Sequence, residues 1–226
     1  MPDAARKDDF IKDVVDVEWV KSLSRGDFTY KDYKNWPEDF RVELIDGMVY
    51  LMASGDNWHQ WLTPELGRQI GNYLLGKKCL LYTEFDVRLF YELDESDKTV
   101  VRPDIIVVCD RNKSFGKKNC QGAPDFIIEI LSESSEGMDF IHKKKAYKKA
   151  GVKEYWIVTK EAVHIFTLVN GEYQEKVVTI HKDLKQPVYC LEGCVIDFQP
   201  VAVMRDELNA DVSVFHKNPL VPGSLR

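Results

Sequence analysis

The hydrophobic positions of this chain follow two periods, one typical of strands and one typical of helices. Residues 41–45 and 48–53 predict two short strands around an Asp46-Gly47 turn, a combination typical of a β-hairpin. The same reading predicts further strands at residues 80–90, 100–108, 125–131, 154–158, 163–169 and 173–180. The strands and helices are interspersed along one chain.

Helical periodicity is clearest in two long segments. Apolar residues recur on one side of residues 57–77, although Pro64 interrupts the pattern early. Residues 137–150 predict the second long helix, which ends at Gly151. A short helix is expected at residues 30–35, with Thr29 as its N-cap. This mixture of elements in one core predicts an α/β or α+β fold.

The length of 226 residues is sufficient for one domain with a full core, and two small domains stay open as an alternative. We expect residues 1–28 to form a loosely attached N-terminal extension, with a short amphipathic helix at 14–23. The main domain is expected at residues 29–200, and residues 201–226 are expected to form a C-terminal tail that is irregular after Asn209.

Composition narrows the class of protein. Hydrophobic residues at 44% and charged residues at 30% describe an ordinary globular chain, without an apolar run that could span a bilayer. The N-terminus lacks the pattern of a secretory signal, so we expect a cytoplasmic protein. The net charge of −6 argues mildly against tight nonspecific nucleic-acid binding, but it does not exclude a nuclease with local basic patches.

The five cysteines form no CxxC pair. Cys190 and Cys194 stand four residues apart with His181 upstream, which is a poor zinc signature. An odd number of cysteines in a chain with no recognised signal favours reduced thiols. We therefore expect neither a disulfide nor a structural zinc.

Glu129 is the first candidate for chemistry. It lies in the run Phe126-Ile127-Ile128-Glu129-Ile130-Leu131, whose two faces are both apolar, as in a central buried strand. A buried carboxylate must be protonated, paired or bound to a metal. A structural ion pair and a metal or catalytic role are both open from this segment alone.

Asp104 is the second candidate, because it follows Pro103 and precedes the apolar run 105–108. Taken alone, an aspartate after proline is more often a turn residue. Its interest comes from Glu129, since two acids on adjacent strands can hold Mg²⁺, which prefers oxygen ligands, or Mn²⁺.

The second long helix supplies a lysine for this pair. At about 100° per residue, one side of the helix collects Asp139, Phe140, Lys143, Tyr147 and Ala150. Four other lysines fall elsewhere, at positions 144, 145, 148 and 149. The Lys143 amine could reach water along an apolar surface, or it could be directed toward Glu129 and Asp104. We favour the second interpretation, because a lysine on a buried face is rare without a partner.

Two further residues gain interest only in combination with these. Glu43 lies in the strand 41–45, on the same face as Ile45, and by itself it would be an ordinary surface residue. His59, near the start of the first long helix, would by itself be structural more often than catalytic.

Several stretches together resemble the Uma-two family of restriction-endonuclease-like proteins, in the PD-(D/E)XK nuclease superfamily. The resemblance runs from about Thr29 to Phe198. It is carried by Glu43-Leu44-Ile45-Asp46-Gly47, His59, Val87-Arg88-Leu89, Arg102-Pro103-Asp104, Gly122-Ala123-Pro124-Asp125, Glu129-Ile130-Leu131-Ser132, Asp139 with Lys143 and Tyr147, and Gly151-Val152-Lys153-Glu154-Tyr155-Trp156.

The resemblance implies a restriction-endonuclease-like core, with a central mixed β-sheet flanked by helices. It implies metal-binding roles for Asp104 and Glu129, an additional acid at Glu43, and a supporting place for Tyr147 beside Lys143. The simplest site of this superfamily has its lysine two residues after the second acid, where this chain has Leu131. The family carries its lysine on the neighbouring helix instead, at the position of Lys143.

Two functions follow from this comparison. The first is a Mg²⁺-dependent endonuclease that hydrolyses DNA phosphodiester bonds, with Asp104 and Glu129 on the metal, Glu43 assisting, Lys143 at the water or phosphate, and His59 in support. The second is a non-catalytic member that binds nucleic acid or a protein, which the acidic charge and displaced lysine favour modestly. Hydrolysis of another phosphate ester is a third possibility, and a homodimer is expected only by analogy.

Overall fold

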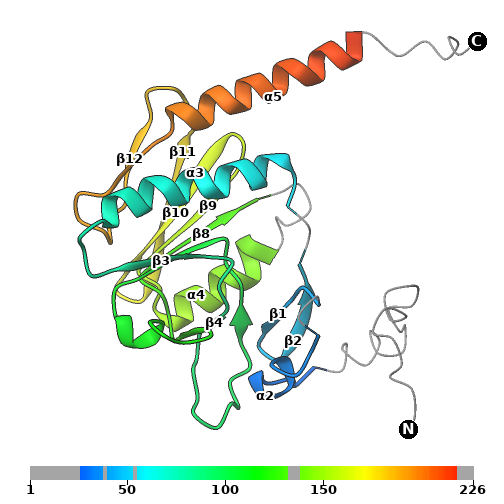
Figure 1. The fold of residues 1–226 in the computed structure, drawn as a ribbon, viewed down its shortest axis with the longest axis vertical. Coiled ribbons are helices and arrows are strands. Elements are labelled where there is room, and N and C mark those ends of the chain that lie inside the picture. The colour runs from blue at the N-terminus through cyan, green and yellow to red at the C-terminus, as the bar shows by residue number, and fades with distance from the viewer. Residues whose placement is uncertain (1–25, 38–39, 53–54, 132–137, 218–226) are drawn as a thin grey trace, which may run out of the picture.

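The computed structural model describes residues 26–37, 40–52, 55–131 and 138–217. Its largest unit is a six-stranded mixed sheet in the order β11-β10-β9-β8-β6-β3 (Figure 1). Its strands are β3 (Leu80–Thr83), β6 (Ile105–Val108), β8 (Phe126–Ile130), β9 (Glu154–Val158), β10 (Ala162–Val169) and β11 (Glu172–Thr179). Only β8 and β9 pair in parallel within this sheet, and its other described pairs are antiparallel.

A five-stranded sheet in the order β2-β1-β5-β4-β7 lies beside the larger one. Its strands are β1 (Val42–Ile45), β2 (Met48–Leu51), β4 (Val87–Arg88), β5 (Val100–Val101) and β7 (Cys120–Gln121). Asp46 and Gly47 both have positive φ between β1 and β2, which confirms the predicted hairpin. A third pair joins β12 (Lys185–Pro187) to β13 (Val195–Asp197).

Helices cover both faces of the six-stranded sheet (Figure 1). Helix α3 (Asn57–Leu74) and the start of α5 (Gln199–Lys217) pack on the face that carries Phe126, Ile128 and Ile130. Helix α4 (Lys144–Ala150) packs on the opposite face, together with apolar residues of the smaller sheet. The short elements are α2 (Tyr30–Tyr33), η2 (Arg111–Lys113) and the π-helix η3 (Met138–Lys143), which leads into α4.

Two predicted strands are each divided in two. Residues 80–90 form β3 and β4, and residues 100–108 form β5 and β6. The breaks face each other at 84–86 and 102–104, where Pro103 has no N–H for a ladder and Glu84 has a φ of 47°. The chain passes from one sheet to the other at these breaks, so the segment 102–104 lies at the junction of the sheets.

The expectation of an irregular tail after Asn209 is wrong, because α5 continues to Lys217. Its first turn places Val201 and Ala202 in the core, so the helix is anchored to the larger sheet. The predicted helix at 14–23 and the first residue of the predicted helix 137–150 lie outside the described residues. None of the described helices has the length and apolarity that a membrane span requires.

The expectation that all thiols are reduced is also wrong, since Cys79 and Cys109 form a disulfide. Register explains the pair: Leu80 lies opposite Val108 in the β3–β6 ladder, and the two cysteines occupy the next position along the two chains. Cys120, Cys190 and Cys194 are free. Cysteine spacing could not reveal this pair, because it depends on which strands are neighbours.

Removing this disulfide should lower the free energy of unfolding, because a cross-link that closes a loop of about 30 residues restricts the unfolded chain. The chain-entropy relation gives about 3–4 kcal/mol for the double change of Cys79 and Cys109 to Ser, measured by chemical denaturation without reductant. Denatured, unreduced protein should titrate as three thiols, the number of free cysteines. Titration of all five cysteines would contradict the disulfide.

Candidate active site

The site is built around Glu129, near the end of the central strand β8. Every residue of β8 is buried, and the strand is paired with β6 on one side and β9 on the other. Glu129 shares its face with Ile127 and Leu131, which belong to the cluster that α4 covers. The side chain is only 3% exposed, so it needs partners for its charge.

Lys143 and Tyr147 supply two of those partners from the covering helix. The Lys143 ammonium lies 3.0 Å from Glu129 Oε1, and the Tyr147 hydroxyl donates a 2.7 Å hydrogen bond to the same oxygen. Lys143 is the last residue of η3 and is 6% exposed, whereas Lys145 two residues later is exposed. The predicted burial of Lys143 on the sheet-facing side is therefore confirmed, as is the left-handed Gly151 that ends α4.

Glu43 reaches the same ammonium from the other sheet. Its Oε1 lies 2.9 Å from Lys143 Nζ, and it also accepts a 2.8 Å hydrogen bond from the backbone N–H of Arg102. Glu43 lies on β1, whose four residues are all buried, and it is not the surface residue that its strand alone suggested. Lys143 thus joins acids from two separate sheets.

Asp104 lies at the entrance to β6. Continuing the β6–β8 register by one residue places it opposite Glu129. Its Oδ2 accepts a 2.6 Å hydrogen bond from the backbone N–H of Ile130, and this bond fixes the carboxylate beside β8. Asp104 thus lies in a bend just before β6, and it also lies beside Glu129, as the sequence predicted.

His59 approaches Asp104 from the opposite layer, on the first turn of α3. Its Nε2 lies 2.8 Å from Asp104 Oδ1, and this hydrogen bond raises the pKa of the imidazole, against the opposing effect of burial. Asp56 caps the helix by accepting the backbone N–H of His59. His59 Nδ1 is buried and has no hydrogen-bond partner among the described residues.

The structure thus brings the six predicted residues into two connected groups. Lys143 and Tyr147 hold Glu129 together with Glu43, while His59 holds Asp104. The groups meet along β8, because Asp104 binds the N–H of Ile130, the residue directly after Glu129.

The donor set has the chemistry that a hard divalent cation requires. Carboxylate oxygens are the preferred protein ligands of Mg²⁺, which commonly uses one or two of them and keeps several waters. Three carboxylates and one ammonium carry a formal charge of −2 when His59 is neutral, which one divalent cation would balance. Among the described residues, no three or more His, Cys, Asp or Glu side chains lie close enough together to hold a metal ion as a group.

Three residues contribute to the geometry in ways that the sequence did not reveal. The backbone N–H of Arg102 orients Glu43, and its side chain donates a 2.7 Å hydrogen bond to Asp86. A Cβ at Gly55 would lie 2.5 Å from His59 Nδ1, so glycine allows the ring to approach the backbone. The sequence gave no signal for Asp86, because its partner Arg102 is 16 residues away along the chain. It gave none for Gly55 either, because this residue acts only by leaving space for the His59 ring.

This chain is similar to a known protein family and to a solved structure. The model of the Uma2 family, described as "Putative restriction endonuclease", matches residues 30–199. The crystal structure of a "putative nuclease belonging to DUF820" from Anabaena variabilis superposes with a TM-score of 0.60 at 17% identity, covering 79% of this chain and 99% of that one. A search of curated proteins gives no match. The second comparison confirms the predicted restriction-endonuclease-like fold. The first covers most of the sequence, and it shows that this chain belongs to the Uma2 family, as the motifs around Glu43, Asp104, Glu129 and Lys143 predicted.

Proposed function

We propose that this protein is a Mg²⁺-dependent endonuclease that hydrolyses DNA phosphodiester bonds. The observation that carries the proposal is the buried Lys143 ammonium, within 3.0 Å of acids from both sheets. Asp104 stands beside them at the junction of the sheets. Acids and an amine in this arrangement provide what metal-assisted phosphodiester hydrolysis needs.

Each residue has a place in this proposal. Asp104 and Glu129 would hold Mg²⁺, or Mn²⁺ in its place, and Glu43 would assist directly or through water. The bound metal would polarise the phosphodiester and lower the pKa of an attacking water. Lys143 would stabilise the additional negative charge on the phosphate in the transition state. His59 and Tyr147 would position Asp104 and Glu129, respectively, through the hydrogen bonds described above.

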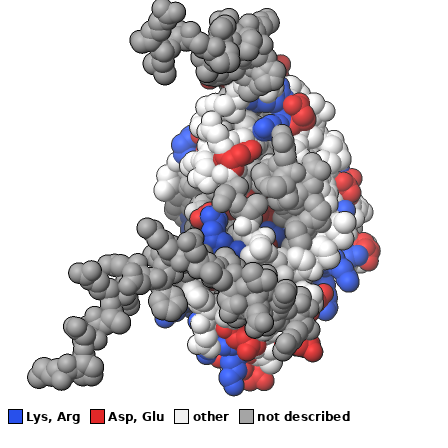
Figure 2. All heavy atoms as spheres, turned by 90° about the vertical axis from the view of Figure 1, so that its right-hand side faces the viewer, with Lys and Arg blue, Asp and Glu red and all other residues white. Residues whose placement is uncertain are grey.

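The acidic net charge argues only mildly against binding nucleic acid, and the proposal depends on the charges near the site. Where Figure 2 shows described residues, basic and acidic side chains are interspersed. Salt screens charges beyond about 8–10 Å at ordinary ionic strength. The binding of a phosphate therefore depends on the cations near it more than on the net charge of the protein.

A second candidate is a non-catalytic member of the family that binds nucleic acid or a protein. One observation favours it: the Lys143 ammonium lies within 3.0 Å of both Glu43 and Glu129, so the protein itself supplies a cation for these two acids. Such a protein would retain the ion pairs for the stability of the fold alone.

Calorimetric titration with Mg²⁺ or Mn²⁺ separates the two candidates. The endonuclease should bind one of these ions at millimolar concentration or below, and the change of Asp104 to Asn should abolish the binding heat, because a carboxylate ligand is lost. Absence of binding to the unaltered protein at millimolar concentration would favour the non-catalytic candidate.

The changes Asp104→Asn and Glu129→Gln should each abolish metal-dependent nicking of supercoiled plasmid DNA. Each replaces a carboxylate by an amide of the same shape, so the thermal unfolding midpoint should show that the protein stays folded. Glu172→Gln is a matched control, because Glu172 is exposed and pairs only with Lys148 among the described residues. Nicking that survives both site changes would exclude the assignment.

The change Lys143→Met should lower the free energy of unfolding by about 3–5 kcal/mol, because two buried glutamates lose their shared cation. Mg²⁺ should restore part of this loss, since a cation that binds only the folded state stabilises it. Denaturation curves with and without Mg²⁺ measure both effects. Lys145→Met, on the exposed side of the same helix, should change neither quantity. An unchanged stability of the Lys143 variant would contradict the role of the ion pairs.

A further inference from the structure

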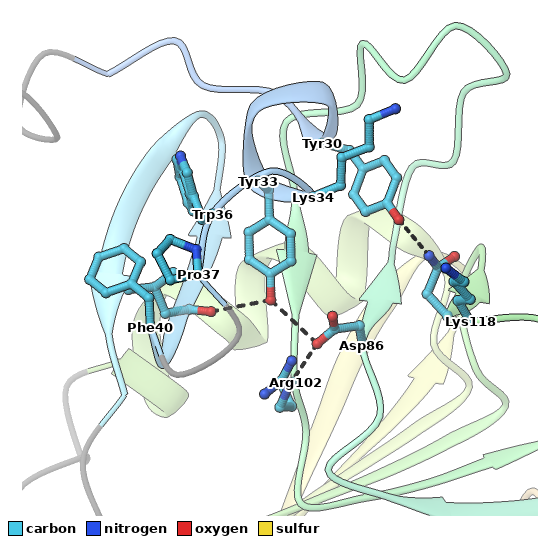
Figure 3. A pocket seen from close by; sticks show the side chains of 11 residues that line it. Tyr30, Tyr33, Lys34, Trp36, Pro37, Phe40, Asp86, Arg102 and Lys118 are labelled. Atoms are coloured by element: carbon cyan, nitrogen blue, oxygen red, sulfur yellow. Dashed lines mark hydrogen bonds and ion pairs between the residues drawn. The ribbon is translucent and has the colours of Figure 1, made fainter. Parts of the chain in front are cut away.

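An aromatic pocket of about 430 Å³ lies next to the candidate active site. Its volume is within the range of roughly 300–1,000 Å³ that is typical of small-molecule sites. The residues that line it include Tyr30, Tyr33, Trp36, Phe40, Arg102 and Asn119. Figure 3 shows the Tyr33 ring between Tyr30 on one side and Trp36 and Phe40 on the other, with its hydroxyl directed toward Asp86.

The aromatic rings of the pocket come from one short stretch of chain. Tyr30 and Tyr33 stack with 6.3 Å between ring centroids, and Trp36 lies 5.6 Å from Tyr33. These rings are half-buried, so each keeps surface that a ligand can cover. Tyr30 is held in place by the Arg88 guanidinium, 3.8 Å from its ring centroid. The pocket therefore presents positioned ring faces and does not depend on a flexible side chain.

The polar atoms of the pocket are incompletely satisfied. Asn119 is 7% exposed, and its Nδ2 donates to the Tyr30 hydroxyl, but its Oδ1 has no partner among the described residues. Among the described residues, the hydrogen bonds of the Tyr33 hydroxyl are long, 3.4 Å to the Val42 carbonyl and 3.3 Å to Asp86 Oδ1. Burial raises the pKa of Tyr33, so the hydroxyl keeps its proton. A buried acceptor without a donor is costly, and a ligand with N–H groups would remove that cost.

Basic side chains also line the aromatic pocket. Arg102, Lys34 and Lys118 line the pocket, and Lys118 is exposed and makes no ion pair with any other described residue. Arg102 also connects the pocket to the active site, because its backbone N–H binds Glu43 and Asp104 follows two residues later. Val42 lines the pocket while its neighbour Glu43 lies in the site. Two chain segments thus connect the pocket to the residues of the candidate site over one or two residues, a span of a few ångströms.

We propose that this pocket receives one unpaired nucleobase of the DNA strand whose backbone occupies the active site. The aromatic faces stack on the base, Asn119 Oδ1 accepts one of its N–H groups, and the cations face the adjoining phosphates. This inference rests on the proposed function for the class of substrate, and it adds that the substrate has a single-stranded or locally opened segment.

The test measures binding without cleavage. The Asp104→Asn protein is titrated, in the absence of divalent metal, into a fluorescent single-stranded oligodeoxynucleotide and into the same strand carrying abasic sugars. Both probes have the same phosphates, so any difference reports the bases. Removing a base–aromatic stack typically weakens binding about fivefold to a hundredfold, and we expect the abasic strand to bind more weakly by a factor in that range.

Pocket variants assign the difference to its site. Trp36→Ala and Tyr33→Ala should each reduce the preference for the base-containing strand, while Tyr33→Phe, which keeps the ring, should retain it. Tyr189→Ala is the matched control, because Tyr189 is exposed and lies outside the pocket, between β12 and β13. Circular dichroism confirms that each variant is folded, and Tyr33→Phe and Trp36→Ala suffice if Tyr33→Ala unfolds.

Equal binding of the two strands, or a preference that survives the pocket changes, would overturn the inference. These outcomes are independent of the proposed catalysis. A protein that discriminates the strands but never nicks DNA retains the pocket and loses the endonuclease. One that nicks DNA with the expected dependence on Asp104, yet ignores the bases, retains the endonuclease and loses the pocket.

Discussion

The buried ammonium of Lys143 is the interaction on which the rest of this structure depends. Glu43 and Glu129 belong to different sheets, and both are almost completely removed from water. Without a cation between them, their repulsion and desolvation would oppose the packing of the two sheets. Because the lysine comes from the turn that leads into α4, it also fixes this helix against β8. One side chain therefore connects the helical segment after β8 to β8 itself and to β1, which comes much earlier in the sequence.

The sequence predicted the fold, and it selected six residues that the structure brings into two connected groups. Local patterns selected Glu129 and Lys143, whereas the resemblance to a family added Glu43 and His59. β8 is apolar on both faces, and the helical period selects Lys143 from its neighbours. The failures share a different cause. The Cys79–Cys109 disulfide follows from strand register, the division of the two long strands follows from the junction of the sheets, and the length of α5 depends on anchorage by its first turn. Each of these features depends on contacts between distant parts of the chain, which the periodicity of one segment cannot predict.

The burial of Glu43 illustrates the same limit within the site. Alternation along β1 indicated an ordinary surface strand, but β1 lies between β2 and β5 in the smaller sheet and all four of its residues are buried. Only the resemblance to a family pointed to this acid, whereas the geometry gives it two partners, Lys143 and the Arg102 N–H. Sequence periodicity identifies which residues share a face, but it does not identify what covers that face.

Arg102 connects the candidate active site to the aromatic pocket. Its backbone N–H donates a hydrogen bond to Glu43, and its guanidinium donates one to Asp86. Asp104 follows two residues later in the chain. A base that displaced the pocket side of Arg102 would therefore move the segment that carries both an acid and the donor to another acid. Peptide geometry allows Arg102 and Asp104 only about 7 Å between their Cα atoms, so little of such a movement could be absorbed before it reached Asp104. A base in the pocket would then affect the positions of the Asp104 and Glu43 carboxylates through the backbone at Arg102.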